Sequence, residues 1–147
     1  MFKHILISTD GSPVSNKAAK AGIALAKALR SKITAYCAIE PLQLIYGMEG
    51  YALDQKTFDD IEQSARAVAL KQVDAIGKWA KAVGVPFAAV VTKAYTPYEG
   101  IITAAKKQKC DVIFMASHGR RGLSKLVMGS VTQKVLTHSK IPVVVYR

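Results

Sequence analysis

The chain has 147 residues, half of them hydrophobic, which suits a single domain spanning residues 1–147 and leaves too little for two domains. No apolar run approaches the roughly 18 consecutive residues of a membrane-spanning helix. The N-terminal residues lead directly into a strand-like segment instead of a signal peptide, so we expect a soluble, cytoplasmic protein that does not engage membranes.

The formal net charge of +11 raises the question of nucleic-acid binding. However, the Lys and Arg residues are scattered over all the predicted helices, without aromatic interleaving or a recognised nucleic-acid motif. Solvated helix faces explain most of them, and a basic nucleic-acid-associated protein remains a second alternative. Cys37 and Cys110 have neither metal-ligand nor redox-motif spacing, so we interpret them as buried thiols.

The first predicted strand covers Ile5 to Thr9, and a helix follows from Pro13 to Arg30 with Ser12 as its N-cap. Asp10 therefore stands at the carboxyl end of the first strand, which is the edge where open parallel sheets bind ligands. Its carboxylate could accept a hydrogen bond from a base or a sugar, or help hold a metal ion. The alternative is a turn carboxylate that stabilises the start of the helix.

A second strand is predicted from Ile33 to Ile39. The residues from Pro41 to Leu53 are apolar without a clear period, which indicates a loop packed over another part of the molecule, as a flap or an interface. The strongest helical pattern runs from Thr57 to Val83, and Gly84 is placed as its C-terminal stop. The residues of its predicted buried stripe are Ile61, Ala65, Val68, Gln72, Ile76, Trp79 and Val83.

A third strand is predicted from Val85 to Thr92, and Pro86 near its start indicates an edge strand. Thr96-Pro97-Tyr98-Glu99 has the spacing of a capping box, so a helix should begin there and run to about Lys109. The segment from Asp111 to Ala116 is the fourth predicted strand.

The connection that follows, residues 116–130, is long for a compact domain, in which links of about four to six residues are usual and longer ones are often functional. The spacing of Ser130 and Gln133 matches a capping box, which predicts a helix opening at Ser130. Helix starts leave N–H groups unpaired, so Gly129 and Ser130 could bind a phosphate. The alternative is a flexible surface loop. Three basic residues could screen a polyphosphate: Arg120, Arg121 and Lys125.

Strands and helices alternate five times, ending with a strand from Ile141 to Arg147, and several strands are continuous apolar runs. This pattern predicts an α/β fold with a doubly wound, five-stranded parallel sheet and helices on both faces, which is a Rossmann-like arrangement. Asp10 and the 116–130 connection both follow strands, so they should meet at the binding edge. If the last strand lies at an edge, Val143 to Arg147 could pair with a second copy, and we expect a homodimer.

The motifs of several enzyme classes are absent. There is no Walker-type phosphate loop, no dinucleotide-binding glycine fingerprint after the first strand, no nucleophile elbow and no zinc-ligand spacing. Of the three histidines only His118 falls in the candidate site, where its ring could hydrogen-bond a phosphate or a ribose. The alternative for His118 is a polar surface residue.

From end to end the chain resembles a single-domain universal stress protein. The resemblance rests on Ile5 to Ser12 with the Ala-rich helix that follows, on Ile141 to Arg147, and above all on the loop. The ATP-binding branch of that family carries a glycine, two residues, a second glycine, nine residues, and then Gly-Ser or Gly-Thr. Here Gly119 is followed by nine residues and Gly129-Ser130, whereas Ala116 stands in the place of the first glycine.

The resemblance implies a bound ATP, with Mg²⁺ held through the nucleotide at Asp10. Carried over by position, the implied contacts are adenine with Thr9, Asp10 and Ala38, ribose with Met115 and Ala116, and the phosphates with Gly119, Gly129, Ser130, Val131 and Thr132. A Cβ at position 116 is harmless if the backbone φ is negative, but costs about 1 kcal/mol or more in the left-handed region.

The sequence and the resemblance together predict an adenine-nucleotide (ATP)-binding stress-response protein that acts as a homodimer. No general base can be assigned, so we expect a nucleotide-dependent state with at most slow ATP hydrolysis, and not an enzyme with fast turnover. The alternative is a nucleotide-independent dimeric interaction or signalling protein of the same fold.

Overall fold

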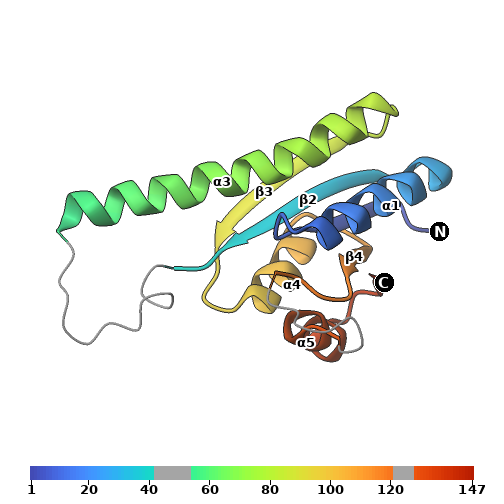
Figure 1. The fold of residues 1–147 in the computed structure, drawn as a ribbon. Helices are drawn as coiled ribbons and strands as arrows, with labels where there is room; N and C mark the ends of the chain where they lie inside the picture. The colour runs from blue at the N-terminus through green and yellow to red at the C-terminus, as the bar shows by residue number, and fades with distance from the viewer. Residues whose placement is uncertain (42–53, 121–127) are drawn as a thin grey trace.

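The computed structural model describes residues 1–41, 54–120 and 128–147. The predicted packed loop from Pro41 to Leu53 lies outside these residues apart from Pro41, and so do Arg121 and Lys125. The elements, in chain order (Figure 1), are β1 (His4–Ser8), α1 (Pro13–Leu29), β2 (Lys32–Ile39), α3 (Gln55–Ala82), β3 (Phe87–Lys93), α4 (Pro97–Lys107), β4 (Val112–Ala116), α5 (Ser130–His138) and β5 (Val143–Tyr146).

The strands form one parallel sheet in the order β3-β2-β1-β4-β5. The chain first moves outward from β1 to β2 and β3, and then crosses to the other side of β1 to lay down β4 and β5. The strand order therefore reverses between β1 and β4, and the carboxyl ends of these two strands flank a topological switch point. The predicted doubly wound five-stranded sheet is confirmed.

Helices cover both faces of the sheet (Figure 1). Alternation along β1 sends Ile5 and Ile7 into the core beneath α1 and α3, and sends Leu6 into the core beneath α4 and α5. All three side chains are fully buried, because neither face of the central strands meets solvent. Covering on both faces explains why the inner strands are continuous apolar runs.

The outermost strands are β3 and β5. The predicted edge position of β3 is confirmed, and Pro86 precedes the strand, where its carbonyl accepts from the Ile33 N–H at 2.8 Å and no N–H is needed. At the other edge, β5 pairs with β4, while its opposite side faces no other strand of the described chain. The backbone of β5 is thus left open on one side.

The ends of α1 agree with the sequence prediction. Ser12 is the N-cap, its hydroxyl accepts from the Ser15 N–H at 3.2 Å, and Pro13 occupies the first turn. The capping box predicted at the start of α4 is only partly right. Thr96 is the N-cap, but its hydroxyl donates to the Glu99 carboxylate and does not cap a backbone N–H.

The buried stripe of α3 differs from the predicted one. Val68 is 52% exposed and Val83 is 39% exposed, and of the seven predicted residues only Ile76 is buried. The helix carries apolar residues around more than one face, so periodicity alone could not fix which face meets the sheet. The buried residues are Ala69, Val73, Ile76 and Ala80.

Both cysteines are buried free thiols, as predicted, and burial raises the pKa of Cys37 and of Cys110 to about 11. They are therefore protonated at neutral pH. Within the described ranges, none of the helices has the length and apolar character needed to cross a membrane.

The orientation of α3 can be tested by truncating one residue on its buried face and one on its exposed face. We expect Ile76→Ala to lower the free energy of unfolding by about 2–5 kcal/mol, because a fully buried side chain leaves a cavity. The matched change Val68→Ala should cost less than about 0.5 kcal/mol, since this side chain is half exposed. Urea denaturation measures both values, and similar losses at the two positions would contradict the observed orientation of α3.

Candidate functional site

The site lies where the strand order reverses, and the register of the sheet assembles it. Extending the β1–β2 register by two residues brings Asp10 beside Ala38. Extending the β1–β4 register by two residues brings Thr9 beside Ala116. Residues that are far apart in the sequence, and that the resemblance assigns to one ligand, thus lie at the carboxyl ends of neighbouring strands, at the same edge of the sheet.

Asp10 joins the two sides of this crevice. Its Oδ1 accepts from the Ser12 N–H at 2.9 Å, and its Oδ2 accepts from the Arg120 N–H, 110 residues away, at 2.8 Å. Gly119 lies so close that an added Cβ would touch Oδ2. Asp10 therefore stabilises the start of α1, as the alternative interpretation stated, and also holds the first part of the 116–130 connection.

The hydrogen bonds to Asp10 also set its charge. Burial alone would raise the pKa of this carboxyl, but hydrogen bonds from Ser12 and Arg120 lower it by more, so that the net pKa lies below the usual value. Asp10 is therefore ionised at neutral pH. Its negative charge is matched locally by two backbone N–H dipoles.

The turn after β1 is closely built. The buried Thr9 hydroxyl accepts from the Gly11 N–H at 3.0 Å and lies 3.1 Å from the Ser15 hydroxyl. Gly11 has a φ of +75°, a conformation that favours glycine. A Cβ at Gly11 would also lie 2.5 Å from Cδ of Gln72, so there is no room for a side chain at position 11 unless Gln72 moves.

α5 begins at Ser130, as predicted, but its cap differs from the predicted one. Gly129, not Ser130, is the N-cap, with φ −62° and ψ 145°, and the described structure shows no side-chain hydrogen bond capping this end. The reason is tertiary: the Gly129 N–H donates to the Ser117 carbonyl at 2.7 Å, which keeps Gly129 extended beside the end of β4. The predicted Ser130–Gln133 capping box is therefore wrong.

This cap leaves a row of N–H donors at the helix start. The first backbone hydrogen bond of α5 runs from the Gln133 N–H to the Gly129 carbonyl at 3.0 Å, so the three preceding N–H groups have no acceptor inside the helix. They belong to Ser130, Val131 and Thr132, the positions that the resemblance assigns to phosphates. Together with the positive end of the helix dipole they suit an anion.

The side chains of the predicted site residues are not all available to a ligand. The buried Thr132 hydroxyl donates to the Ala116 carbonyl at 2.9 Å and thereby ties α5 to β4. Met115 is buried in the core beneath α4 and α5, and Val131 packs against that core. The side chains of Met115 and Thr132 are therefore closed to a ligand, that of Val131 is half-buried, and that of Ser130 is exposed.

Ala116, which replaces the first glycine of the family pattern, is not strained. Among the non-glycine residues that the structure describes, positive φ occurs at Arg30 and Lys109 and not at Ala116. Its side chain is buried in the core beneath α1 and α3. The Cβ is thus accommodated by core packing, and the unfavourable left-handed alternative does not apply.

His118 and Ser117 form a local polar pair. The Ser117 hydroxyl lies 3.0 Å from His118 Nδ1, and His118 is half-buried, with its Cα and Cβ beside Gly129 at the start of α5. The hydroxyl of Ser117 was not predicted as part of the site, and nothing in its spacing pointed to it. Among the described residues, no group of three or more His, Cys, Asp or Glu side chains gathers, so Mg²⁺ at Asp10 would need phosphate oxygens as further ligands.

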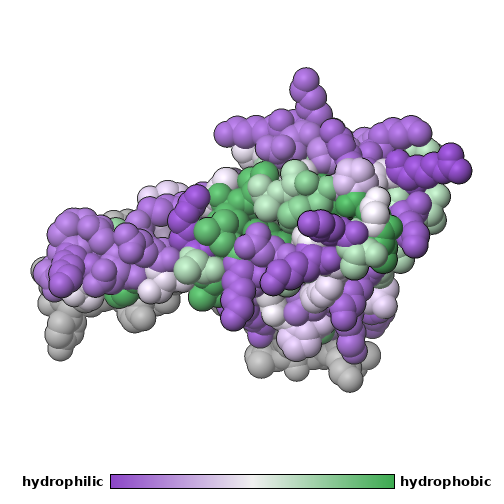
Figure 2. All heavy atoms as spheres, turned by 90° about the horizontal axis from the view of Figure 1, so that it is seen from above, coloured by the Kyte–Doolittle hydropathy of each residue, from purple (hydrophilic) through white to green (hydrophobic). Residues whose placement is uncertain are grey.

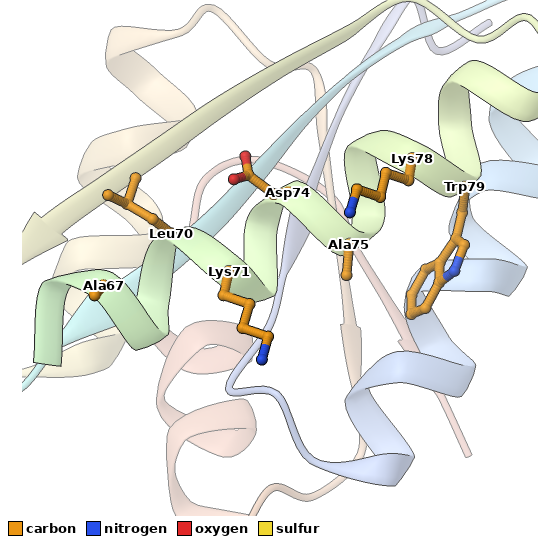
Figure 3. Close-up of a pocket in the computed structure, with 7 residues that line it drawn as sticks. All are labelled: Ala67, Leu70, Lys71, Asp74, Ala75, Lys78 and Trp79. Atoms are coloured by element: carbon orange, nitrogen blue, oxygen red, sulfur yellow. The ribbon is translucent and has the colours of Figure 1, made fainter. Parts of the chain in front are cut away.

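A hollow of about 480 Å³ lies along α3 and is lined by side chains of that helix from Ala67 to Trp79 (Figure 3). Trp79 lines it and also packs against the core, with Lys20 Nζ 4.8 Å from the centre of its ring. Exposed apolar side chains nearby on α3 include Leu70, and Figure 2 shows a hydrophobic patch framed by hydrophilic residues on the upper face of the molecule.

A sequence model of the Universal stress protein family matches residues 1–147. The chain is 27% identical over 147 residues to universal stress protein MJ0531 of Methanocaldococcus jannaschii, an alignment that covers all of this chain and 83% of the relative. It is similar in structure to protein MJ0577 of the same organism, with a TM-score of 0.82 and 24% identity, covering 99% and 95% of the two chains.

A second structural neighbour carries a ligand. It is a universal stress protein family member from Arabidopsis thaliana, described with AMP bound, with a TM-score of 0.68 and 18% identity, covering 97% of this chain and 90% of that one. At these identities the structural likeness shows the fold alone.

The bridge made by Asp10 predicts a specific dependence on pH. We expect Asp10→Asn to lower the free energy of unfolding at pH 7 by about 1–3 kcal/mol, because the amide NH₂ leaves one N–H unpaired. The folded-state pKa of Asp10 is depressed, so its contribution is present above the unfolded-state value of about 3.9 and is lost as the pH falls through the folded value.

Urea denaturation from pH 3 to 7 should therefore show the difference between wild type and Asp10→Asn shrinking toward the acid end. The exposed Asp60 supplies the matched control, since Asp60→Asn should change stability by less than about 0.5 kcal/mol. A difference that stays constant over this pH range would contradict the role assigned to the Asp10 carboxylate.

Proposed function

The chain belongs to the universal stress protein family, and we propose that it is a cytoplasmic stress-response protein that binds ATP as a homodimer. The observation that carries the proposal is the start of α5, where the N–H groups of Ser130, Val131 and Thr132 lack intrahelical acceptors. Such a row of donors at the positive end of a helix dipole is suited to a phosphate chain.

The other end of the crevice supports an adenine nucleotide. Thr9 and Asp10 follow β1 beside Ala38 near the end of β2, which is where the resemblance locates the base. The ends of β1 and β4 lie between these residues and the start of α5. The base and the phosphates would therefore lie on opposite sides of the switch point. The related Arabidopsis protein is described with AMP bound.

We propose that the nucleotide sets a conformational or binding state and is hydrolysed slowly at most. The groups at the phosphate end are N–H donors, which bind and orient an anion but do not activate water. Both oxygens of Asp10 already accept backbone hydrogen bonds, so this carboxylate is poorly placed to act as a base. Mg²⁺, bound mainly by the phosphates, would complete the site.

A nucleotide-independent interaction protein of the same fold is the second candidate. The hollow on α3, lined by the exposed Leu70 toward one end and by Trp79 at the other, is the observation that favours it. A protein of this kind would keep the dimer and the apolar surface while ATP left its stability unchanged.

The proposed phosphate site can be tested by removing one N–H without removing the helix. Proline suits the first position of a helix, and Gly129 already has the extended backbone that a residue before proline prefers, so Ser130→Pro should fold normally. It deletes one proposed donor, and we expect the Kd for ATP with Mg²⁺ to rise by about 10-fold or more, the effect of losing a hydrogen bond to a charged group.

Isothermal titration calorimetry measures the affinity, and Ser130→Ala separates the hydroxyl from the N–H. The alanine variant should bind within about threefold of wild type. At 100 times Kd, ATP should stabilise the wild-type protein by about 2.7 kcal/mol. A wild-type protein that shows neither heat of binding nor stabilisation at millimolar ATP would rule out the proposed function.

The proposed dimer predicts a second effect of proline. The carbonyls of Pro142 and Tyr146 accept hydrogen bonds from β4, so by the two-residue period of a strand Val143 and Val145 direct their N–H groups away from the sheet. Val145→Pro removes one outward N–H without touching the β4–β5 ladder. We expect light scattering coupled to size exclusion to show a dimer for wild type and a monomer for Val145→Pro.

The opposite edge of the sheet provides the control. Ala89 lies in β3, where its N–H also points away from β2, and its side chain is exposed. Ala89→Pro should leave the dimer intact. If Val145→Pro remains dimeric, or if wild type is monomeric at tens of micromolar, pairing through β5 is wrong.

A further inference from the structure

Gln72 is a polar residue in the part of α3 that faces the sheet. Its side chain is half-buried, between the buried positions Ala69, Val73 and Ile76. The Cys37 thiol donates to Gln72 Oε1 at 3.2 Å. On its other side the Gln72 side chain lies against Gly11, where an added Cβ would be 2.9 Å from Gln72 Cγ. Gln72 thus spans from the end of β2 to the turn after β1.

These contacts orient the side-chain amide. Burial raises the pKa of Cys37 to about 11, so at neutral pH the thiol carries its proton and can donate it to the amide oxygen. Oε1 is therefore held on the side of Cys37, and Nε2 lies beside Gly11. Within the part of the chain that the structure describes, no protein acceptor is paired with Nε2 of Gln72. An oriented NH₂ donor is left for another partner.

The position of this donor coincides with the proposed base end of the nucleotide site. Gly11 follows Asp10 directly, and Cys37 directly precedes Ala38. The other polar side chains at this end are already engaged, because Asp10 accepts two N–H groups and the Thr9 hydroxyl accepts the Gly11 N–H. A purine ring offers lone pairs on its ring nitrogens, which are acceptors for an amide NH₂.

We propose that Gln72 is a base-recognition residue, whose Nε2 donates a hydrogen bond to a ring nitrogen of the bound adenine while Cys37 holds the amide in place. The inference rests on the proposed ATP-binding function and extends it, since α3 then contributes to base selection. It also gives Gly11 a second role, because any side chain there would displace Gln72.

The test compares a ligand that has the base with one that lacks it. Gln72→Met keeps the length and packing of the side chain but removes the donor. We expect its Kd for ATP to rise by about 3- to 10-fold, the range for losing one neutral hydrogen bond, while its Kd for inorganic triphosphate stays within twofold of wild type. Gln63, exposed on the same helix, provides the matched control Gln63→Met, which should leave both affinities unchanged.

Two further measurements separate recognition from packing. Cys37→Ser retains a donor to Oε1 and should keep ATP affinity, whereas Cys37→Ala should weaken ATP binding and not triphosphate binding. ATP analogues with carbon in place of N1, N3 or N7 identify the acceptor. For wild type, the analogue that lacks this acceptor should have the same raised Kd that ATP has for Gln72→Met. For Gln72→Met, the Kd of this analogue should equal that of ATP.

The inference is overturned if Gln72→Met binds ATP like wild type, or if it loses ATP and triphosphate to the same degree, which indicates a purely structural side chain. In both cases the proposed ATP-binding function survives, because wild type still binds. If the wild-type protein binds no ATP, the proposed function and this inference fail together, and that result is seen before any variant is made.

Discussion

The carboxylate of Asp10 is the group through which the two halves of the sheet meet at the site. One oxygen is bonded to the turn that starts α1, and the other to the backbone of Arg120 after β4. The bridge requires an ionised carboxylate, and the hydrogen bonds themselves hold its pKa low. Because its charge is compensated by N–H groups, Asp10 can lie in a crevice suited to an anionic ligand without strongly repelling it.

The rest of the site follows from the reversal of strand order beside this bridge. The β1–β2 side offers polar and small groups around Asp10 and Gln72, whereas the β4–α5 side offers backbone N–H groups at the start of α5. A ligand with a heterocyclic end and an anionic end matches this division. The crevice is therefore asymmetric in chemistry although the sheet is regular.

The edge strand is connected to the same loop. The Ser117 N–H donates to the Tyr146 carbonyl at 2.8 Å, and the Ser117 carbonyl accepts from Gly129. Ser117 thus lies between β5 and α5, the two elements that we propose for dimer formation and for phosphate binding. Any rearrangement at the start of α5 would act on a residue that is hydrogen-bonded to the edge strand β5.

The sequence determined the features that depend on neighbours along the chain. The alternation of apolar strands and helices, the edge position indicated by Pro86, the Ser12 cap and the location of Asp10 after β1 were all predicted, because propensity, period and local capping encode them. The family pattern likewise placed Gly119 and Gly129 in one connection between β4 and α5.

Only the tertiary structure decided the features that depend on residues distant in sequence. The Ser117 carbonyl moves the cap of α5 to Gly129, core packing accommodates Ala116 without strain, and contact with the sheet selects one of several apolar faces of α3. Gln72 was predicted as one member of an apolar stripe, and only its contacts with Cys37 and Gly11 show how its side-chain amide is oriented. Each of these contacts joins separate elements, and periodicity within one element carries no information about them.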